Sequence, residues 1–252
     1  MSIAWTAYLI GCPLIFLSGV VDAIGGGGGI ISLPAYLIAG LPPQLAIGSN
    51  KLSSSVGTLV STTMFVRRGF VEWKPALIFV AAALSGSAIG ASLVLNVPDA
   101  ILQYGLLVIL PVVAFVVLRR PQTFKSERDG DANLYLATVF AFFIGMYDGF
   151  YGPGTGTFLI LALGGVVHFA LNEAVGYTKV INLSSNIASL VVFLLHGKVH
   201  VPLAGAAILF SVAGQFIGAR LVLRDGQKVV RPVIILVLVL LFIKVIADAF
   251  GA

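Results

Sequence analysis

Residues 22–34 of this chain read DAIGGGGGIISLP, and residues 148–158 read DGFYGPGTGTF, a second aspartate followed by closely spaced glycines. Each motif lies inside an otherwise apolar segment. Because every glycine weakens a helix by about 1 kcal/mol relative to alanine, both motifs predict breaks between helical segments. At membrane depth such breaks are tolerated only where protein or a watery cavity satisfies their backbone groups.

The composition around these breaks indicates a protein that lies in a lipid bilayer. Of the 252 residues, 59% are hydrophobic and 10% are charged, against about 25% charged residues in a soluble domain. So few charges cannot cover the surface of a globule of this size, which excludes a water-soluble fold. No charge precedes Asp22, so we expect the N-terminal stretch to be a membrane segment rather than a signal peptide, which starts with basic residues.

The basic residues predict how the chain is oriented. Lys and Arg cluster in residues 67–74, 119–131 and 220–231 and are scarce in 96–99 and 196–200. By the positive-inside rule, the first three stretches face the cytoplasm and the other two face the opposite side. Because these clusters are short and lie between apolar runs, the net charge of +5 predicts no nucleic acid partner.

Several apolar runs are long enough for membrane helices, which need about 20 residues to cross the hydrocarbon. We expect such segments at 3–22, 45–66, 75–95, 100–118, 133–150, 173–195, 199–219 and 231–249, with shorter pieces at 30–40 and 156–170. Whether the shorter pieces cross the membrane or re-enter it stays open.

The chain contains an internal repeat. Residues 46–95 align without a gap on residues 174–223, with 15 of 50 positions identical, and the matched loops fall on opposite sides by charge. Duplicated halves of opposite orientation are typical of secondary transporters. We therefore predict an all-α polytopic membrane protein of two inverted-topology repeats, 1–120 and 132–252, joined by a cytoplasmic linker at 121–131. The paired broken or re-entrant helices would meet near the bilayer midplane.

Lys51 and Lys179 occupy matching positions in apolar helices. An ammonium group at membrane depth is unfavourable and by default marks a functional site; the alternative is that each side chain extends to the nearby helix end. A polar stripe at helical spacing accompanies each lysine, which indicates that both helix faces line an aqueous path. The stripe residues that we expect along this path are Asn50, Ser54, Asn182 and Asn186.

The glycine-rich breaks are candidate anion sites. Glycines let several N–H groups point at one place, and a helix that starts after a break presents its positive end to an anion. The alternative is that the breaks serve only close helix packing. Together with the two ammonium groups, the N–H donors favour a small oxyanion over a cation. The candidate donors are Gly27, Gly28 and Gly29 in the first break and Gly154, Thr155 and Gly156 in the second.

Asp22 and Asp148 allow two interpretations. Carboxylates at membrane depth can carry protons in transporters. They can also cap the glycine-rich backbone or pair with a lysine. Glu173, close to the predicted start of its helix, is better placed to stabilise that helix than to take part in transport.

No residue pair suits catalysis, and His196 and His200 lack a third ligand for a metal. We therefore expect no catalytic residues, no metal site and no bound cofactor. The glycine pairs Gly86/Gly90 and Gly214/Gly218 have the spacing of close helix packing.

At these motifs the chain resembles the sulfite exporter TauE/SafE family of membrane transporters, and its second half resembles the YfcA-type branch. The segments that carry the resemblance are Asp22 to Pro34, Asn50-Lys51, Asp148 to Phe158, Lys179 to Asn186 and Gly197-Lys198-Val199. The resemblance implies a multi-pass protein of the bacterial inner membrane that moves small sulfur-containing anions such as sulfite, thiosulfate, sulfonates or sulfoacetate.

The combined prediction is a secondary transporter of small anions that works by alternating access, with Asp22 or Asp148 as candidates for proton coupling. Two other classes stay open: an anion channel, and a membrane-embedded partner or assembly protein with no transport of its own. The expected partners are a small anion and the lipid bilayer. The sequence leaves the substrate, the direction, the coupling ion and the choice between monomer and homodimer undecided.

Overall fold

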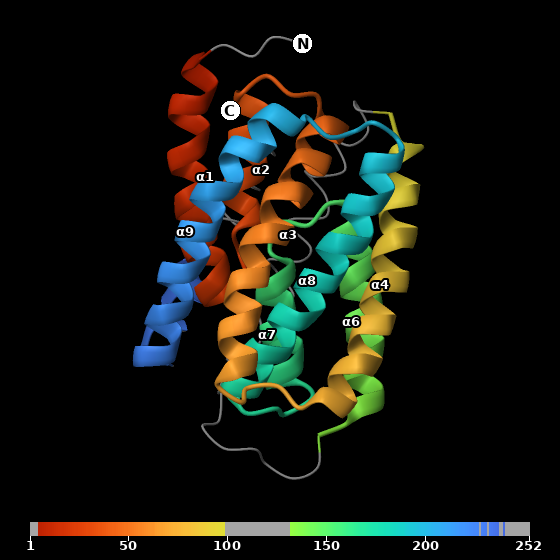
Figure 1. Ribbon diagram of the computed structural model, residues 1–252. Coiled ribbons are helices and arrows are strands. Elements are labelled where there is room, and N and C mark those ends of the chain that lie inside the picture. The colour runs from red at the N-terminus through yellow and green to blue at the C-terminus, as the bar shows by residue number, and fades with distance from the viewer. Residues whose placement is uncertain (1–4, 99–131, 227, 231, 237–238, 240–252) are drawn as a thin grey trace.

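The computed structural model describes residues 5–98, 132–226, 228–230, 232–236 and 239. The predicted span at 100–118, the linker at 121–131 and most of the predicted span at 231–249 lie outside the described residues. Every described element is an α-helix (Figure 1). The helices are α1 (Trp5–Gly25), α2 (Gly29–Ile38), α3 (Pro43–Arg67), α4 (Trp73–Leu95), α6 (Leu134–Phe150), α7 (Thr155–Gly165), α8 (Leu171–Leu195) and α9 (Val201–Asp225).

Local sequence explains where these helices begin and end. Pro43 is the first residue of α3, where its missing N–H costs no hydrogen bond. The matched glycines Gly69 and Gly197 have positive φ angles just after α3 and α8, a conformation that other residues rarely adopt. Glu173 accepts a hydrogen bond from the N–H of Ala170 at the start of α8 (3.0 Å), which agrees with the helix-stabilising role expected for it.

Within the described residues, four helices are long and apolar enough to cross a membrane: α1 from Tyr8 to Gly25, α4, α8 and α9. Helix α3 is as long as α8, at 25 residues or about 37 Å. Its polar stripe makes it less apolar than α8. The stripe is buried against other helices instead of facing outward. The short helices α2 and α7, of 10 and 11 residues, fall below the spanning length.

The helices pack in matched pairs. Helix α1 packs along α9 as α6 packs along α4, and α3 lies against α9 as α8 lies against α4. In Figure 1, α1 and α3 start at the upper end of the bundle, whereas α6 and α8 start at the lower end. Each broken pair, α1–α2 or α6–α7, therefore returns the chain to the end where it began. How this arrangement sits in a bilayer stays a prediction.

Small residues permit the closest of these pairings. A Cβ on Gly86 or Gly90 of α4 would overlap the backbone of α6, and one on Gly214 or Gly218 of α9 would overlap the backbone of α1. The predicted packing role of these glycines is therefore confirmed, because only glycine lets the backbones approach so closely.

The outer helices carry the exposed apolar surface, and the central ones are buried. Leu77 of α4 is 64% exposed and Leu209 of α9 is 72% exposed, whereas every residue of α7 from Thr155 to Gly164 is buried. Large exposed apolar side chains around a bundle are what a lipid-facing surface requires.

Candidate functional site

The two glycine-rich breaks meet backbone to backbone. The carbonyl oxygen of Gly26 accepts hydrogen bonds from the N–H groups of Gly156 (3.0 Å) and Thr157 (3.3 Å). The hydroxyl of Thr157 donates to the carbonyl of Gly25 at 2.6 Å. A Cβ on Gly26 would overlap the backbone of Gly156. Each break thus satisfies some of the backbone hydrogen-bonding groups of the other. This is the close-packing role, the alternative to anion binding.

Because the breaks cross, the hydrogen-bond donors predicted in the second break do not line the central cavity. The N–H of Gly156 is used by Gly26, and the hydroxyl of Thr155 donates to the carbonyl of Gly152 (2.7 Å). Neither residue lines the central cavity described below, nor does Gly154. In the first break Gly28 and Gly29 do line it, whereas Gly27 does not; its carbonyl accepts the N–H of Ile30.

Lys51 and Lys179 are the ninth residues of α3 and α8, and both are almost completely buried, at 1% and 0% exposure. This burial contradicts the alternative in which they extend to the helix ends. Nζ of Lys51 lies 2.8 Å from Oδ2 of Asp148, and Nζ of Lys179 lies 2.9 Å from Oδ2 of Asp22. The pairs are crossed, since each lysine reaches the aspartate of the other half.

These pairs have a clear physical reason. Moving a lone ammonium or carboxylate out of water costs several kcal/mol, and a partner at hydrogen-bond distance offsets much of it. The two lysines and two aspartates together carry no net formal charge. Pairing with a lysine is one of the two interpretations that the sequence leaves open for Asp22 and Asp148, and both pairs are present in the structure.

Further hydrogen bonds hold each pair. Lys51 also donates to Oδ1 of Asn186 (3.0 Å), and the hydroxyl of Ser185 donates to Asp148 (2.6 Å). Around the other pair, Lys179 also donates to the main-chain carbonyl of Asp22, and the amide of Gln215 donates to its carboxylate (2.7 Å).

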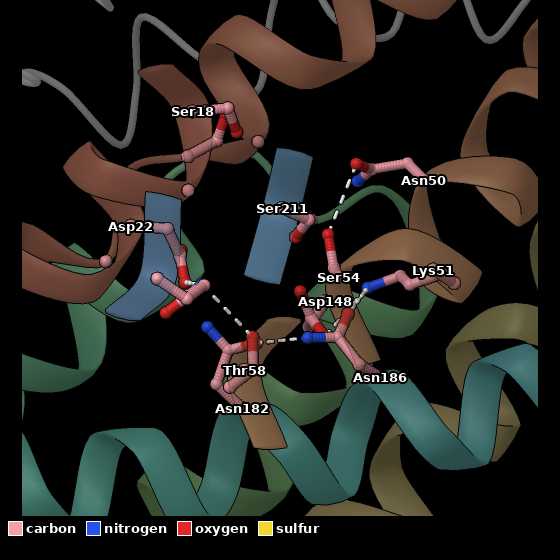
Figure 2. A pocket seen from close by; sticks show the side chains of 16 residues that line it. Ser18, Asp22, Asn50, Lys51, Ser54, Thr58, Asp148, Asn182, Asn186 and Ser211 are labelled. Carbon is pink, nitrogen blue, oxygen red and sulfur yellow. Dashed lines mark hydrogen bonds and ion pairs between the residues drawn. The ribbon is translucent and has the colours of Figure 1, made fainter. Parts of the chain in front are cut away.

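A small cavity of about 30 Å³ lies among these groups, large enough for about two water molecules (Figure 2). Helices α1, α3, α6, α8 and α9 and both breaks contribute to its wall. The predicted site residues that line it are Asp22, Gly28, Gly29, Asn50, Lys51, Ser54, Asp148, Asn182 and Asn186. Lys179 lies behind Asp22 and is not part of the wall.

Several wall residues are not among those predicted from the sequence. Ser18 on α1 and Ser211 and Gln215 on α9 complete the cavity, together with Gly19, Gly26, Thr58 and Gly152. A signal was available for the α9 pair, because Ser211 and Gln215 stand one turn apart in an apolar run. The neighbouring glycines Gly214 and Gly218 instead predicted close helix packing for this segment.

The chain is similar to known membrane proteins over most of its length. The family model described as "Sulfite exporter TauE/SafE" matches residues 12–245. The chain is 35% identical to the "Probable membrane transporter protein YfcA" of Escherichia coli K12, over 93% of this chain and 88% of that protein. It is 32% identical to a "Probable membrane transporter protein" of Haemophilus influenzae, over 92% of each chain. No solved structure matches it.

Proposed function

This chain belongs to the sulfite exporter TauE/SafE family of membrane transporters, and we propose that it is a secondary transporter of small anions that works by alternating access. The substrate we propose is a sulfur oxyanion or a small organosulfonate. One observation carries the proposal: two buried, crossed Lys–Asp pairs meet at one small cavity between the repeated halves. In this proposal the halves are inverted repeats in the bacterial inner membrane.

The size of the cavity supports alternating access rather than a channel. A space of about 30 Å³ cannot hold a sulfite ion together with its hydration shell. The substrate therefore enters only when neighbouring helices move apart. The two ion pairs tie α3 to α6 and α8 to α1, so such a movement changes their surroundings.

The charge balance of the site supports proton coupling. With both pairs formed, an entering anion meets a site of zero net charge. Protonation of either aspartate leaves the site with one net positive charge, which an anion then neutralises. Because the anion and the proton favour each other's binding, they move in the same direction, and the ion gradients decide which direction that is. Asp22 is the more accessible of the two carboxylates, since its side chain is 15% exposed against 4% for Asp148.

The wall offers the groups that an oxyanion needs. Gly28 and Gly29 lie at the positive end of α2. Lys51 supplies an ammonium group, and the amides of Asn50 and Asn182 can donate further hydrogen bonds. These donors lie within one small space and come from three elements, which suits a compact tetrahedral or pyramidal anion.

The test is flux into proteoliposomes that contain the purified chain, with sulfite, thiosulfate, sulfoacetate and a simple sulfonate as substrates. We expect uptake of at least one of them against its gradient when a pH gradient is imposed. Lys51→Gln should abolish this uptake, and the exposed Lys74→Gln should leave it unchanged. Ohmic flux that never concentrates substrate would instead indicate a channel. No flux of any anion would indicate a protein without transport of its own.

Stability must be separated from function in this test. Lys51→Gln leaves Asp148 buried without its cation, which costs about 3–5 kcal/mol. The double variant Lys51→Gln/Asp148→Asn removes both charges and should fold normally. If the double variant still concentrates anions, Lys51 has no part in binding.

A further inference from the structure

A second cavity, of about 560 Å³, opens where α3 and α9 end. Four arginines line it, two from each helix: Arg67 and Arg68, and Arg220 and Arg224. The other described residues of the wall are apolar: Met64, Leu221 and Leu223. Both helix ends belong to loops that the positive-inside rule assigns to the cytoplasm. The central transport site accounts for neither the cavity nor its charge.

Among the described residues, little negative charge compensates the arginines of this cavity. Within the described residues, the carboxylate found beside these arginines is Asp225, 3.7 Å from Arg224, whose side chain is 82% exposed. Such an exposed pair contributes little. The guanidinium of Arg220 lies 4.4 Å from the centre of the Phe216 ring, a contact that keeps its charge free for a ligand. All four arginines are exposed, so water and salt screen part of their mutual repulsion, and an anion bound between them would relieve the rest.

The chemistry of the wall selects an amphiphilic anion. Guanidinium groups bind phosphate oxygens in pairs, with geometry that a lysine cannot reproduce. Met64 and the two leucines give an acyl chain an apolar surface beside the charged part. One turn away, Phe216 and Ile217 of α9 are exposed and would continue that surface into the lipid.

The internal repeat shows that the arginines are not a requirement of the fold. At the same offset of 128 residues, the positions of Arg67, Arg68, Arg220 and Arg224 correspond to Leu195, His196, Ser92 and Asn96. These matched residues lie at the ends of α8 and α4, which form the equivalent seam of the other half. The positive-inside rule explains on which side arginines occur, but not why four of them share one cavity.

We propose that this cavity binds the phosphate headgroup of an anionic phospholipid of the cytoplasmic leaflet. Basic pockets between membrane helices on that side are suited to such headgroups. A bound lipid would join the ends of α3 and α9, two helices that also form the wall of the transport site. This inference does not depend on the transported substrate.

The test uses the full chain in nanodiscs and in detergent, with lipid binding measured by native mass spectrometry and by thermal unfolding. We expect at least tenfold preference for phosphatidylglycerol or cardiolipin over phosphatidylcholine. Replacing arginines by the residues of the other half (Arg68→His/Arg220→Ser/Arg224→Asn) should remove that preference. A matched control, Lys74→Gln/Lys198→Gln, removes two basic residues elsewhere and should retain it.

Two outcomes would overturn the proposal. One is an unchanged lipid preference in the triple variant. The other is equal stabilisation of the wild type by millimolar inorganic phosphate or sulfate, which would make the cavity a site for free anions. If the triple variant does not fold, a variant with all four arginines replaced by lysine keeps the charge. Loss of the preference for anionic lipid in that variant would support bidentate phosphate binding, and full retention would contradict the proposal.

Discussion

The Lys51–Asp148 and Lys179–Asp22 pairs are equivalent by sequence but differ in their surroundings. Both lysines are the ninth residues of matched 25-residue helices, and the ion-pair distances are 2.8 and 2.9 Å. Asp148 has a side-chain exposure of 4%, whereas that of Asp22 is 15%. Both aspartates line the cavity, but the carboxylate of Asp148 is nearly sealed by its neighbours, whereas that of Asp22 is more open to the cavity.

Two matched positions account for this difference. Ser185 donates to Asp148, and its counterpart in the first half is Gly57. Gly57 leaves room for Ser211 and Gln215, since a Cβ there would overlap Oγ of Ser211 and lie 3.2 Å from Cγ of Gln215. Gln215 donates to Asp22, and its counterpart is Ser87, which donates to the carbonyl of Ser185. The surroundings of Asp22 therefore contain Gly57 and Gln215, where those of Asp148 contain two serines, Ser185 and Ser87.

The comparison suggests that the repeat preserves the charge pairs, while the surrounding residues give them different tasks. The more buried pair is suited to hold helices together while it presents Lys51 to a substrate. The pair with the more accessible carboxylate is suited to exchange a proton. The experiments below test this division of roles, beginning with the largest expected effect.

Lys51→Gln should have the largest effect on stability, about 3–5 kcal/mol, because it leaves the sealed carboxylate of Asp148 without a cation. The measurement is unfolding by SDS titration in mixed micelles. The charge-free double variant Lys51→Gln/Asp148→Asn should recover most of the loss. If the single variant is as stable as the wild type, the pair is not buried as described.

Gly26→Ala should destabilise the protein by about 2–4 kcal/mol, because the new Cβ overlaps the backbone of Gly156 and the φ angle of +72° disfavours alanine. Gly11→Ala in α1 is the matched control, since a Cβ there meets open space. That control should be neutral or slightly stabilising. Equal effects of the two changes would show that the breaks do not cross closely. Thermal unfolding in detergent would distinguish these results.

Asp22→Asn should cost about 3 kcal/mol, because it leaves the buried ammonium group of Lys179 without a carboxylate. The loss should be smaller than for Asp148→Asn, because Asp22 is more exposed and an amide can still bond with Gln215. The effect of Asp22→Asn on the pH dependence of flux should be larger than that of Asp148→Asn. Wild-type flux should rise as the pH falls, because protonation leaves the site positive, and the Asn variant should lose that dependence. Initial flux rates across a pH series measure this. A pH response retained in Asp22→Asn but lost in Asp148→Asn would reverse the roles of the two pairs.

Gly57→Ser/Gln215→Ser gives the Asp22 pair the two serines found near Asp148. We expect a loss of about 1–3 kcal/mol, since a new hydroxyl replaces the amide that bonds with Asp22, and the hydroxyl of Ser211 must turn away from the new Cβ. Gly57→Ser alone should be worse, because its side chain would crowd Ser211 and Gln215. The informative measurement is the pH dependence of flux, which should weaken as the pair becomes sealed. An unchanged profile would mean that these neighbours do not set the difference.

Glu173→Ala should have the smallest effect, about 0.5–2 kcal/mol, through loss of the hydrogen bond to the N–H of Ala170. The corresponding start of α3 has a proline, Pro43, and no side-chain cap. Helix α8 should therefore fray slightly more than α3 in this variant, which hydrogen exchange of the two helix starts can measure. A large loss of flux would contradict the purely structural role of this residue.

Much of the fold was predictable because it follows from short-range patterns. The length of the apolar runs, the glycine-rich breaks and the repeat offset of 128 residues are all visible in the sequence. The helix bounds follow the predicted segments within a few residues, as for 75–95 and Trp73–Leu95. Polar side chains at membrane depth are unfavourable and by default mark a functional site. This rule predicted the site residues Lys51, Asn50, Ser54, Asn182 and Asn186.

What the sequence by itself determined is that a bilayer protein of two related halves carries lysines, aspartates and broken helices at matched places. Only the tertiary structure decided that each lysine meets the aspartate of the opposite half, and that Gly156 faces Gly26 rather than the cavity. The physical reason is that periodicity reports which face of a helix is polar, but not which other helix covers it. Partners more than 100 residues apart, such as Asp22 and Gln215, meet only when the halves pack together.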